Sequence, residues 1–190
     1  SQVDNLECPD LLVFDLDPAS DVSMREIFRV AEELKQRLDD LGLNTFLRVT
    51  GGKGLHLVVP LVPKLKWDEA KAFCRALAQR AASDDKKRLT ANMSKSKRHG
   101  RTFIDYLRNG RGATAIASYS TRARPGAPVA VPVSWDELNE TLTPNRYTLE
   151  NLHRRLGALS DDPWKTFDKA RRPLTAKMLA AVGIKNGRAT

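Results

Sequence analysis

The sequence has 190 residues, 41% of them hydrophobic, and its 32 Lys and Arg against 23 Asp and Glu give a formal net charge of +9. A chain of this length buries roughly 70% of its unfolded surface as one domain, so a globular enzyme is feasible, and the positive charge favours nucleic acid or nucleotide as partner. No apolar run approaches the ~20 residues of a spanning helix, and the two cysteines indicate neither a disulfide framework nor a zinc site. We therefore expect an intracellular protein with no signal peptide and no membrane partner.

Two acidic residues close the first apolar run of the chain. Residues 11–17 read Leu-Leu-Val-Phe-Asp-Leu-Asp and predict a buried strand on which Asp15 and Asp17 share one face. Paired carboxylates repel each other unless a cation compensates, and oxygen ligands of this kind suit Mg²⁺ or Mn²⁺ better than zinc. For this pair alone, a strand end whose acids face solvent is an equally good interpretation.

A helix and two further strands follow. Ser23 and Glu26 have the spacing of a capping box and predict a helix that Gly42 ends. Residues 44–49 and 55–61 are expected to be strands on either side of a turn, and residues 67–82 a second amphipathic helix.

The turn between these strands reads Thr-Gly-Gly-Lys-Gly at residues 50–54. Glycines let backbone N–H groups approach an anion and Lys53 adds charge, as in phosphate-binding loops. The spacing of a Walker loop is absent, and a plain glycine turn remains an alternative. His56 alternates with Leu55 and Leu57, so it is expected to face away from the main core.

A basic stretch and a third acid come next. Residues 84–101 are expected to be a loop whose Lys and Arg bind nucleic acid or form a solvated face; the binding candidates are Lys95, Lys97, Arg98 and Arg101. Residues 103–107 predict a strand carrying Asp105, which residues 113–119 would join as a hairpin. If this strand adjoins residues 11–17, three carboxylates can hold two metal ions ~3.5–4 Å apart. Pairing of Asp105 with Arg108 or Arg111 is the alternative.

The rest of the chain gives fewer signals. Residues 122–133 predict an extended connection, and leucines between 149 and 159 predict a short helix. Trp164, Phe167 and Leu174 could dock the tail, whereas residues 185–190 are expected to be solvated or frayed. Haloacid-dehalogenase phosphatases also begin with Asp-x-Asp after a strand, but the Pro18-Ala19 continuation and the lack of a later acidic pair disfavour that class.

Taken together, five motifs resemble the polymerase domain of bacterial ligase D, within the archaeo-eukaryotic primase superfamily. The resemblance runs from about Val3 to Trp164. The motifs are Asp-Leu-Asp-Pro at 15–18, Thr-Gly-Gly-Lys-Gly-Leu-His at 50–56, Met-Ser-Lys-Ser-Lys-Arg at 93–98, Asp-Tyr-Leu-Arg-Asn-Gly-Arg-Gly-Ala-Thr-Ala at 105–115 and Tyr-Ser-Thr-Arg-Ala-Arg-Pro-Gly-Ala-Pro-Val at 119–129.

The resemblance implies an α/β fold with a mixed sheet, like that of an RNA-recognition motif, flanked by helices. It implies addition of nucleotides, preferably ribonucleotides, to DNA ends in non-homologous end joining, served by two Mn²⁺ (or Mg²⁺) ions. The residues carried over are Asp15, Asp17 and Asp105 as catalytic metal ligands, Thr50, Lys53 and His56 as the triphosphate site, and Arg108 and Arg122 as further nucleotide contacts.

The resemblance also sets expectations for organisation and partners. Residues 1–164 would be the C-terminal two-thirds of the family domain and residues 165–190 a tail, since members usually carry a longer segment, with DNA contacts, before the Asp-x-Asp strand. Expected partners are DNA ends, nucleoside triphosphates and a ligase domain or end-binding repair protein in the bacterial cytoplasm, at the nucleoid. The alternative function is a non-catalytic nucleic-acid-binding module; three carboxylates opposite a basic site favour the enzyme.

Overall fold

The computed structural model describes residues 1–185 and 188–189, and its centre is one mixed sheet of six strands in the order β4-β5-β1-β3-β2-β6. β4 and β5 run parallel and the other neighbours antiparallel, which confirms the expected mixed α/β sheet. The strands are β1 (Leu11–Pro18), β2 (Phe46–Val49), β3 (Leu55–Pro60), β4 (Leu89–Thr90), β5 (Thr102–Asp105) and β6 (Val131–Val133).

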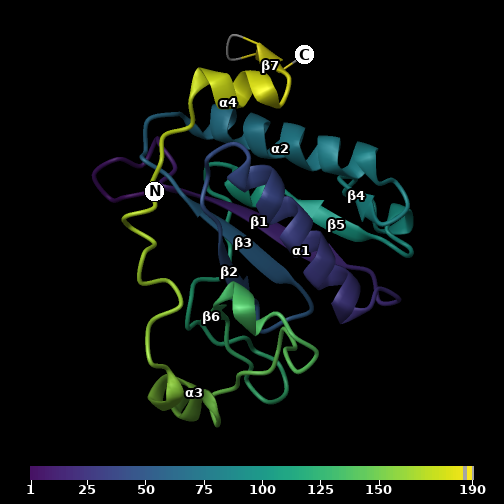
Figure 1. Ribbon diagram of the computed structural model, residues 1–190, viewed down its shortest axis with the longest axis vertical. Helices are drawn as coiled ribbons and strands as arrows, with labels where there is room; N and C mark the ends of the chain where they lie inside the picture. The colour runs from purple at the N-terminus through teal and green to yellow at the C-terminus, as the bar shows by residue number, and fades with distance from the viewer. Residues whose placement is uncertain (186–187, 190) are drawn as a thin grey trace.

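Two long helices cover one face of this sheet (Figure 1). They are α1 (Met24–Asp39) and α2 (Trp67–Asp84), close to their predicted bounds. The shorter α3 (Leu152–Ala158) and α4 (Ala176–Ala181) lie at opposite ends of the molecule, and β7 (Ile184–Lys185) pairs with β8 (Arg188–Ala189) beside α4. Short 3₁₀ turns are η1 (Lys95–Lys97), η2 (Leu107–Asn109) and η3 (Trp135–Glu137). Within the described residues, every helix is too short or too polar to cross a membrane.

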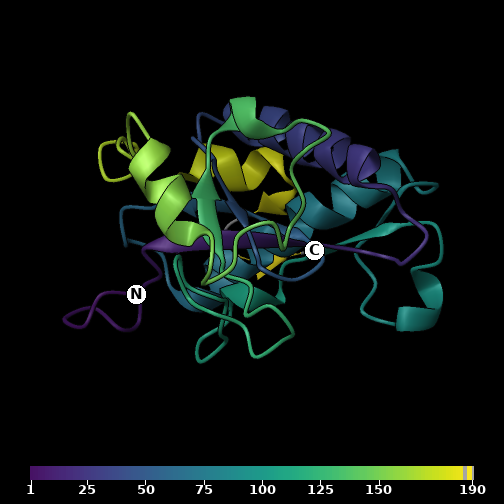
Figure 2. The ribbon, with the colours of Figure 1, turned by 90° about the horizontal axis from the view of Figure 1, so that it is seen from below.

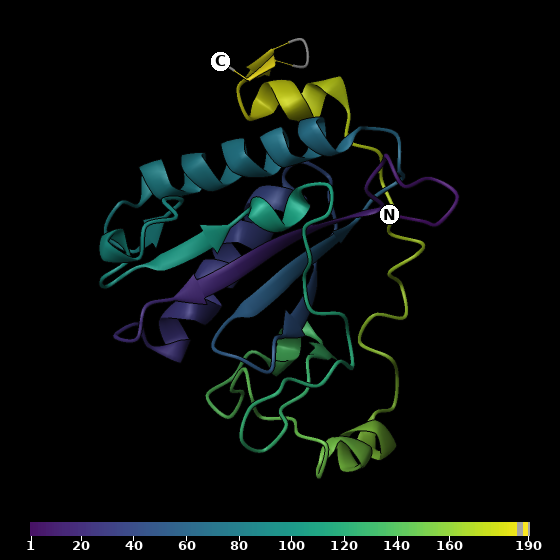
Figure 3. The ribbon, with the colours of Figure 1, turned by 180° about the vertical axis from the view of Figure 1, so that it is seen from behind.

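The alternation of β1 decides which face carries the acids. Leu12, Phe14 and Leu16 are fully buried in the core beneath the helices. Because successive side chains on a strand point to opposite faces, Asp15 and Asp17 lie on the face opposite to Leu12, Phe14 and Leu16. This is the face of the sheet that α1 and α2 leave uncovered (Figure 3). Figure 2 shows the sheet edge-on, with these helices on one side and the loops after β5 on the other.

The predicted hairpin of residues 103–107 with residues 113–119 is wrong. β5 ends at Asp105 and the chain turns into η2, where the buried Asn109 side chain lies against β1. Its Oδ1 accepts a hydrogen bond from Val13 N (2.7 Å) and its Nδ2 donates to Val13 O (2.8 Å). One amide side chain thus pairs the backbone groups of β1 that a longer β5 would have paired.

The following segment pairs elsewhere. Tyr119 N donates to Ala130 O and Ala130 N donates to Ser120 O, so the chain just after residue 118 lies beside the residues that precede β6. Part of the predicted loop at residues 84–101 is also more ordered than expected, because β4 pairs with β5 and η1 forms a turn. The short helix predicted near Leu152 is confirmed as α3.

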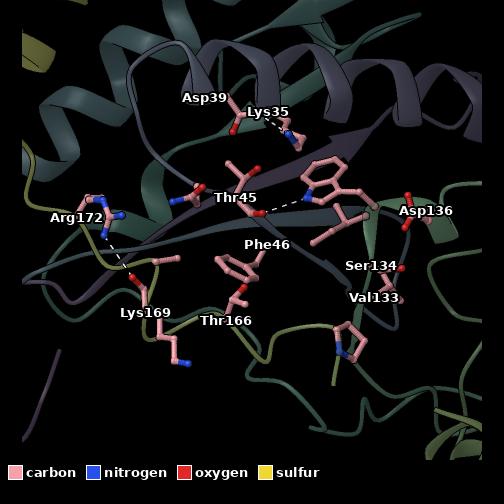
Figure 4. A pocket seen from close by; sticks show the side chains of 15 residues that line it. Lys35, Asp39, Thr45, Phe46, Val133, Ser134, Asp136, Thr166, Lys169 and Arg172 are labelled. Atoms are coloured by element: carbon pink, nitrogen blue, oxygen red, sulfur yellow. Dashed lines mark hydrogen bonds and ion pairs between the residues drawn. The ribbon is translucent and has the colours of Figure 1, made fainter. Parts of the chain in front are cut away.

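The tail packs on the edge of the sheet through aromatic side chains. Phe46 meets Trp164 and Phe167 edge-on at centroid distances of 5.8 and 5.0 Å, and Trp164 Nε1 donates to Leu47 O. Beside Phe46, a cavity of about 540 Å³ lies between α1, this sheet edge and the tail (Figure 4). The expected fraying of residues 185–190 includes residues 186–187 and 190, which lie outside the described part of the chain.

We expect replacement of Asn109 with alanine to lower the free energy of unfolding by about 2–6 kcal/mol, because it leaves two buried backbone groups of Val13 unpaired at ~1–3 kcal/mol each. Urea unfolding of the variant would measure the loss. Asn92→Ala, which removes an exposed loop hydrogen bond, is the matched control. A loss no larger than that of the control would show that water or a shifted backbone satisfies Val13.

Candidate functional site

Four side chains from four neighbouring strands form one row across the uncovered face. The register places Asp105 (β5) opposite Asp15 (β1), Asp15 opposite His56 (β3), and His56 opposite Arg48 (β2). His56 and Arg48 are only 2% and 6% exposed. His56 faces away from the helix-covered core, as predicted, but it lies buried between a cation and a carboxylate.

An arginine bridges the two acids at one end of the row. Arg108 Nε lies 3.2 Å from Asp105 Oδ2 and 3.5 Å from Asp15 Oδ2, so both carboxylates face the same point. Asp105 Oδ1 also accepts a hydrogen bond from Leu107 N at 2.8 Å. The alternative pairing of Asp105 with Arg108 is therefore observed, in addition to its proximity to Asp15, whereas Arg111 pairs with Glu7.

Asp17 has a different partner. Arg98 Nη1 lies 2.7 Å from Asp17 Oδ2, and the Arg98 guanidinium lies 4.0 Å from the centre of the Phe103 ring. Arg98, predicted as a nucleic-acid contact, thus pairs with Asp17 of the site. Lys95 and Lys97, predicted to share that role, are exposed. Arg101, the fourth residue of that prediction, is half-buried.

Acidic and basic side chains share a cavity of about 190 Å³ at this end of the sheet. The sequence-predicted residues that line it are Asp15, Asp17, Thr50, Lys53, Arg108 and Arg122, together with Gly52, Gly54 and Arg124. His56 and Asp105 lie behind it, in contact with Asp15 or with Arg108. The larger cavity of Figure 4 has none of these residues in its lining.

The loop at residues 50–54 is held in shape by its own contacts. Thr50 Oγ1 donates to Gly54 O and accepts from Gly52 N, and Arg122 Nε donates to Thr50 O at 2.6 Å. A Cβ on Gly54 would lie 1.9 Å from Leu16 O, so only glycine allows the loop to approach β1 this closely. Lys53 is exposed and forms no hydrogen bond or ion pair with the other described residues.

Burial and charge set the two acids apart. Burial raises the pKa of Asp15, but the hydrogen bond from His56 and the charges of Arg108 and Arg122 outweigh it, so the pKa of Asp15 lies below its usual value. The pKa of Asp105 is raised, mainly by burial and slightly by Asp15. Burial lowers the pKa of Arg48 to about 10, so its guanidinium stays charged at neutral pH.

The carboxylates fit a hard divalent cation in donor chemistry, since three acidic side chains offer only oxygen ligands. In the described part of the chain, no group of three or more His, Cys, Asp or Glu side chains is arranged to hold a metal ion. Arg108 and Arg98 lie against the oxygens of these carboxylates. Metal binding here requires both guanidinium groups to withdraw.

Sequence reasoning missed two residues of this site. Arg124 lines the cavity together with Arg122. The two arginines are two positions apart in one Pro-rich segment, so that in an extended chain both side chains point the same way, and this spacing could have identified Arg124. Arg48 lies next to His56 across the sheet. Its charge inside an apolar strand was a signal, but the register between β2 and β3 was needed to identify its partner.

Known proteins resemble the chain over most of its length. A family model described as the LigD primase-polymerase domain matches residues 1–164. The multifunctional non-homologous end joining protein LigD of Pseudomonas aeruginosa is 42% identical over 180 residues, which are 94% of this chain and 21% of that protein. Its counterpart in Mycolicibacterium smegmatis is 40% identical over 127 residues, 67% of this chain and 17% of that protein.

A solved structure is also similar. The polymerase domain of Mycobacterium tuberculosis ligase D, in complex with DNA, superposes with a TM-score of 0.79 at 34% identity, over 85% of this chain and 56% of that chain. The chain spans about a fifth of the length of the curated relatives named above.

Proposed function

Because this chain belongs to the LigD primase-polymerase domain family, we propose that it is a nucleotidyltransferase that adds nucleotides to DNA ends in non-homologous end joining. The observation that carries the proposal is the cavity in which Lys53, Arg108, Arg122 and Arg124 face Asp15 and Asp17. Clustered cations attract a polyphosphate, and adjacent carboxylates supply what phosphoryl chemistry needs for divalent ions.

The residues divide into two roles. Lys53, Arg122 and Arg124 bind the phosphates of the incoming nucleotide, and the backbone of residues 50–54 shapes their approach. Asp15, Asp17 and Asp105 would hold two Mn²⁺ or Mg²⁺ ions, which would lower the pKa of an attacking hydroxyl and stabilise the leaving pyrophosphate. Arg108 and Arg98, which pair with these carboxylates in the structure, would then be free to bind the anionic phosphates.

Primer extension tests this assignment and the proposed sugar preference together. The chain is incubated with a DNA end, Mn²⁺ and either ribonucleoside or deoxyribonucleoside triphosphates. We expect weak or undetectable extension by this chain alone and, where extension is measured, faster extension with ribonucleotides. Equal rates would reject the sugar preference, and DNA binding without nucleotide binding would favour a non-catalytic binding module instead.

Three cations of this basic stretch, Lys95, Lys97 and Arg101, are proposed to contact DNA. We expect Lys95→Gln, Lys97→Gln and Arg101→Gln together to lower the slope of log affinity against log salt by roughly 2–3, because each lost phosphate contact lowers it by ~0.7–0.9. Fluorescence anisotropy with a labelled duplex measures the slope. Lys64→Gln, Lys169→Gln and Lys177→Gln, exposed lysines elsewhere on the chain, are the matched control. An unchanged salt dependence in the first triple variant would show that these side chains do not contact DNA and only form a solvated face.

The remaining partners follow from the family. The curated relatives are named as non-homologous end joining proteins, and the structural neighbour was solved with DNA. We propose that this chain likewise meets DNA ends together with a ligase domain or an end-binding repair protein, in the bacterial cytoplasm at the nucleoid. Co-purification of tagged chain with such a protein, dependent on broken DNA, would test this.

A further inference from the structure

The row across the sheet contains a buried cation whose position the chemistry above leaves unexplained. Arg48 Nη2 lies 2.9 Å from His56 Nδ1, and its Nη1 donates to Ser118 Oγ at 3.3 Å. Its guanidinium also lies 5.7 Å from the centre of the Trp164 ring, so the docked tail covers it. Beyond His56, the imidazole Nε2 lies 3.4 Å from Asp15 Oδ2.

The hydrogen-bonding capacity of arginine fixes the direction of this chain of contacts. A guanidinium carries only donors, so the atom that Arg48 Nη2 meets must accept, and Nδ1 must present its lone pair. The proton of a neutral imidazole is then on Nε2, which faces a carboxylate oxygen that only accepts. The opposite tautomer would place two donors against each other at Arg48 and two acceptors against each other at Asp15.

We propose that Arg48 is a positioning residue that holds His56 in the Nε2–H tautomer, with this N–H directed at Asp15 and the cavity. His56 therefore acts there as a hydrogen-bond donor to an anion. With Nε2 protonated, it neither ligates a cation nor accepts a proton through that atom. The tautomer itself does not depend on the proposed function. Only the identification of the bound anion as a nucleotide phosphate rests on it.

The tautomer can be read directly by ¹⁵N NMR, without metal or nucleotide. In the full chain carrying His99→Gln and His153→Gln, His56 is the one imidazole left. We expect Nδ1 to show the shift of an unprotonated nitrogen and Nε2 that of a protonated one. Arg48→Met is expected to remove this difference, whereas Arg48→Lys, whose ammonium can still donate to Nδ1, is expected to keep it. Arg37→Met, at a surface ion pair on α1, is the control and should change nothing.

Two results would overturn the inference: a protonated Nδ1 in the parent chain, which needs no variant, or an unchanged pattern in folded Arg48→Met. Calorimetry with ATP and Mn²⁺ separates this inference from the proposed function. We expect Arg48→Met to weaken nucleotide binding roughly ten-fold and Arg48→Lys to restore it. A lost tautomer with unchanged nucleotide affinity would support the positioning role and contradict the assignment of His56 to the nucleotide site.

Discussion

Replacement of Asp105 with asparagine is expected to lower the rate of nucleotide addition by roughly 100–1000-fold. Under the proposed mechanism, the substitution removes one of three carboxylates that would hold the divalent ions, a loss worth several kcal/mol of barrier. Asparagine keeps the size of the side chain and an oxygen that can accept the hydrogen bond from Leu107 N. Single-nucleotide addition to a DNA end, measured under excess enzyme, gives the rate.

The control for this variant is Asp84→Asn, which removes a carboxylate from a surface ion pair with Arg37. It should leave the rate unchanged. Circular dichroism and an unfolding curve establish that the Asp105 variant is folded. A folded Asp105→Asn protein with parental activity would contradict the assignment of this residue to catalysis.

Replacement of Lys53 with methionine is expected to weaken nucleotide binding by roughly 10–100-fold, because a charge-assisted hydrogen bond to phosphate is worth ~1.5–3 kcal/mol. Lys53 suits this test because it is exposed and pairs with none of the other described residues, so its removal disturbs no internal contact. Titration of a fluorescent ribonucleotide in the presence of Mn²⁺ measures the dissociation constant.

Lys177→Met, an exposed lysine on α4, removes the same charge from another part of the molecule. It separates loss of a specific contact from loss of net charge. If both variants bind the nucleotide equally well, the glycine-rich loop is only a turn between two strands. If both bind it equally weakly, overall charge attracts the nucleotide and Lys53 has no special role.

The sequence was sufficient to place the acids on one face because strand alternation has a period of two. Once residues 11–17 form a strand with Leu12 and Phe14 in the core, Asp15 must point to the opposite side. The glycine-rich turn and both long helices were predictable for similar reasons, since capping, periodicity and glycine are local signals.

Contacts that depend on register or on distant side chains were not predictable. The Asn109 amide, which ends β5 and removes the expected hairpin, bonds to β1 across 96 positions of sequence. The link between Arg98 and Asp17 spans 81 positions, so composition alone assigned Arg98 to a solvated or DNA-binding loop. Arg48 became part of the site only when the pairing of β2 with β3 was known.

Metal-dependent nucleotide binding tests the central claim most directly. Isothermal titration calorimetry would compare ATP binding to the chain with Mn²⁺, with EDTA, and with Mn²⁺ after Asp15→Asn. The account predicts saturable binding with Mn²⁺ that is lost or greatly weakened in the other two titrations, because the carboxylates and the cations of the cavity hold one metal–nucleotide complex. Equal affinity in all three titrations, or no binding with Mn²⁺, would contradict it.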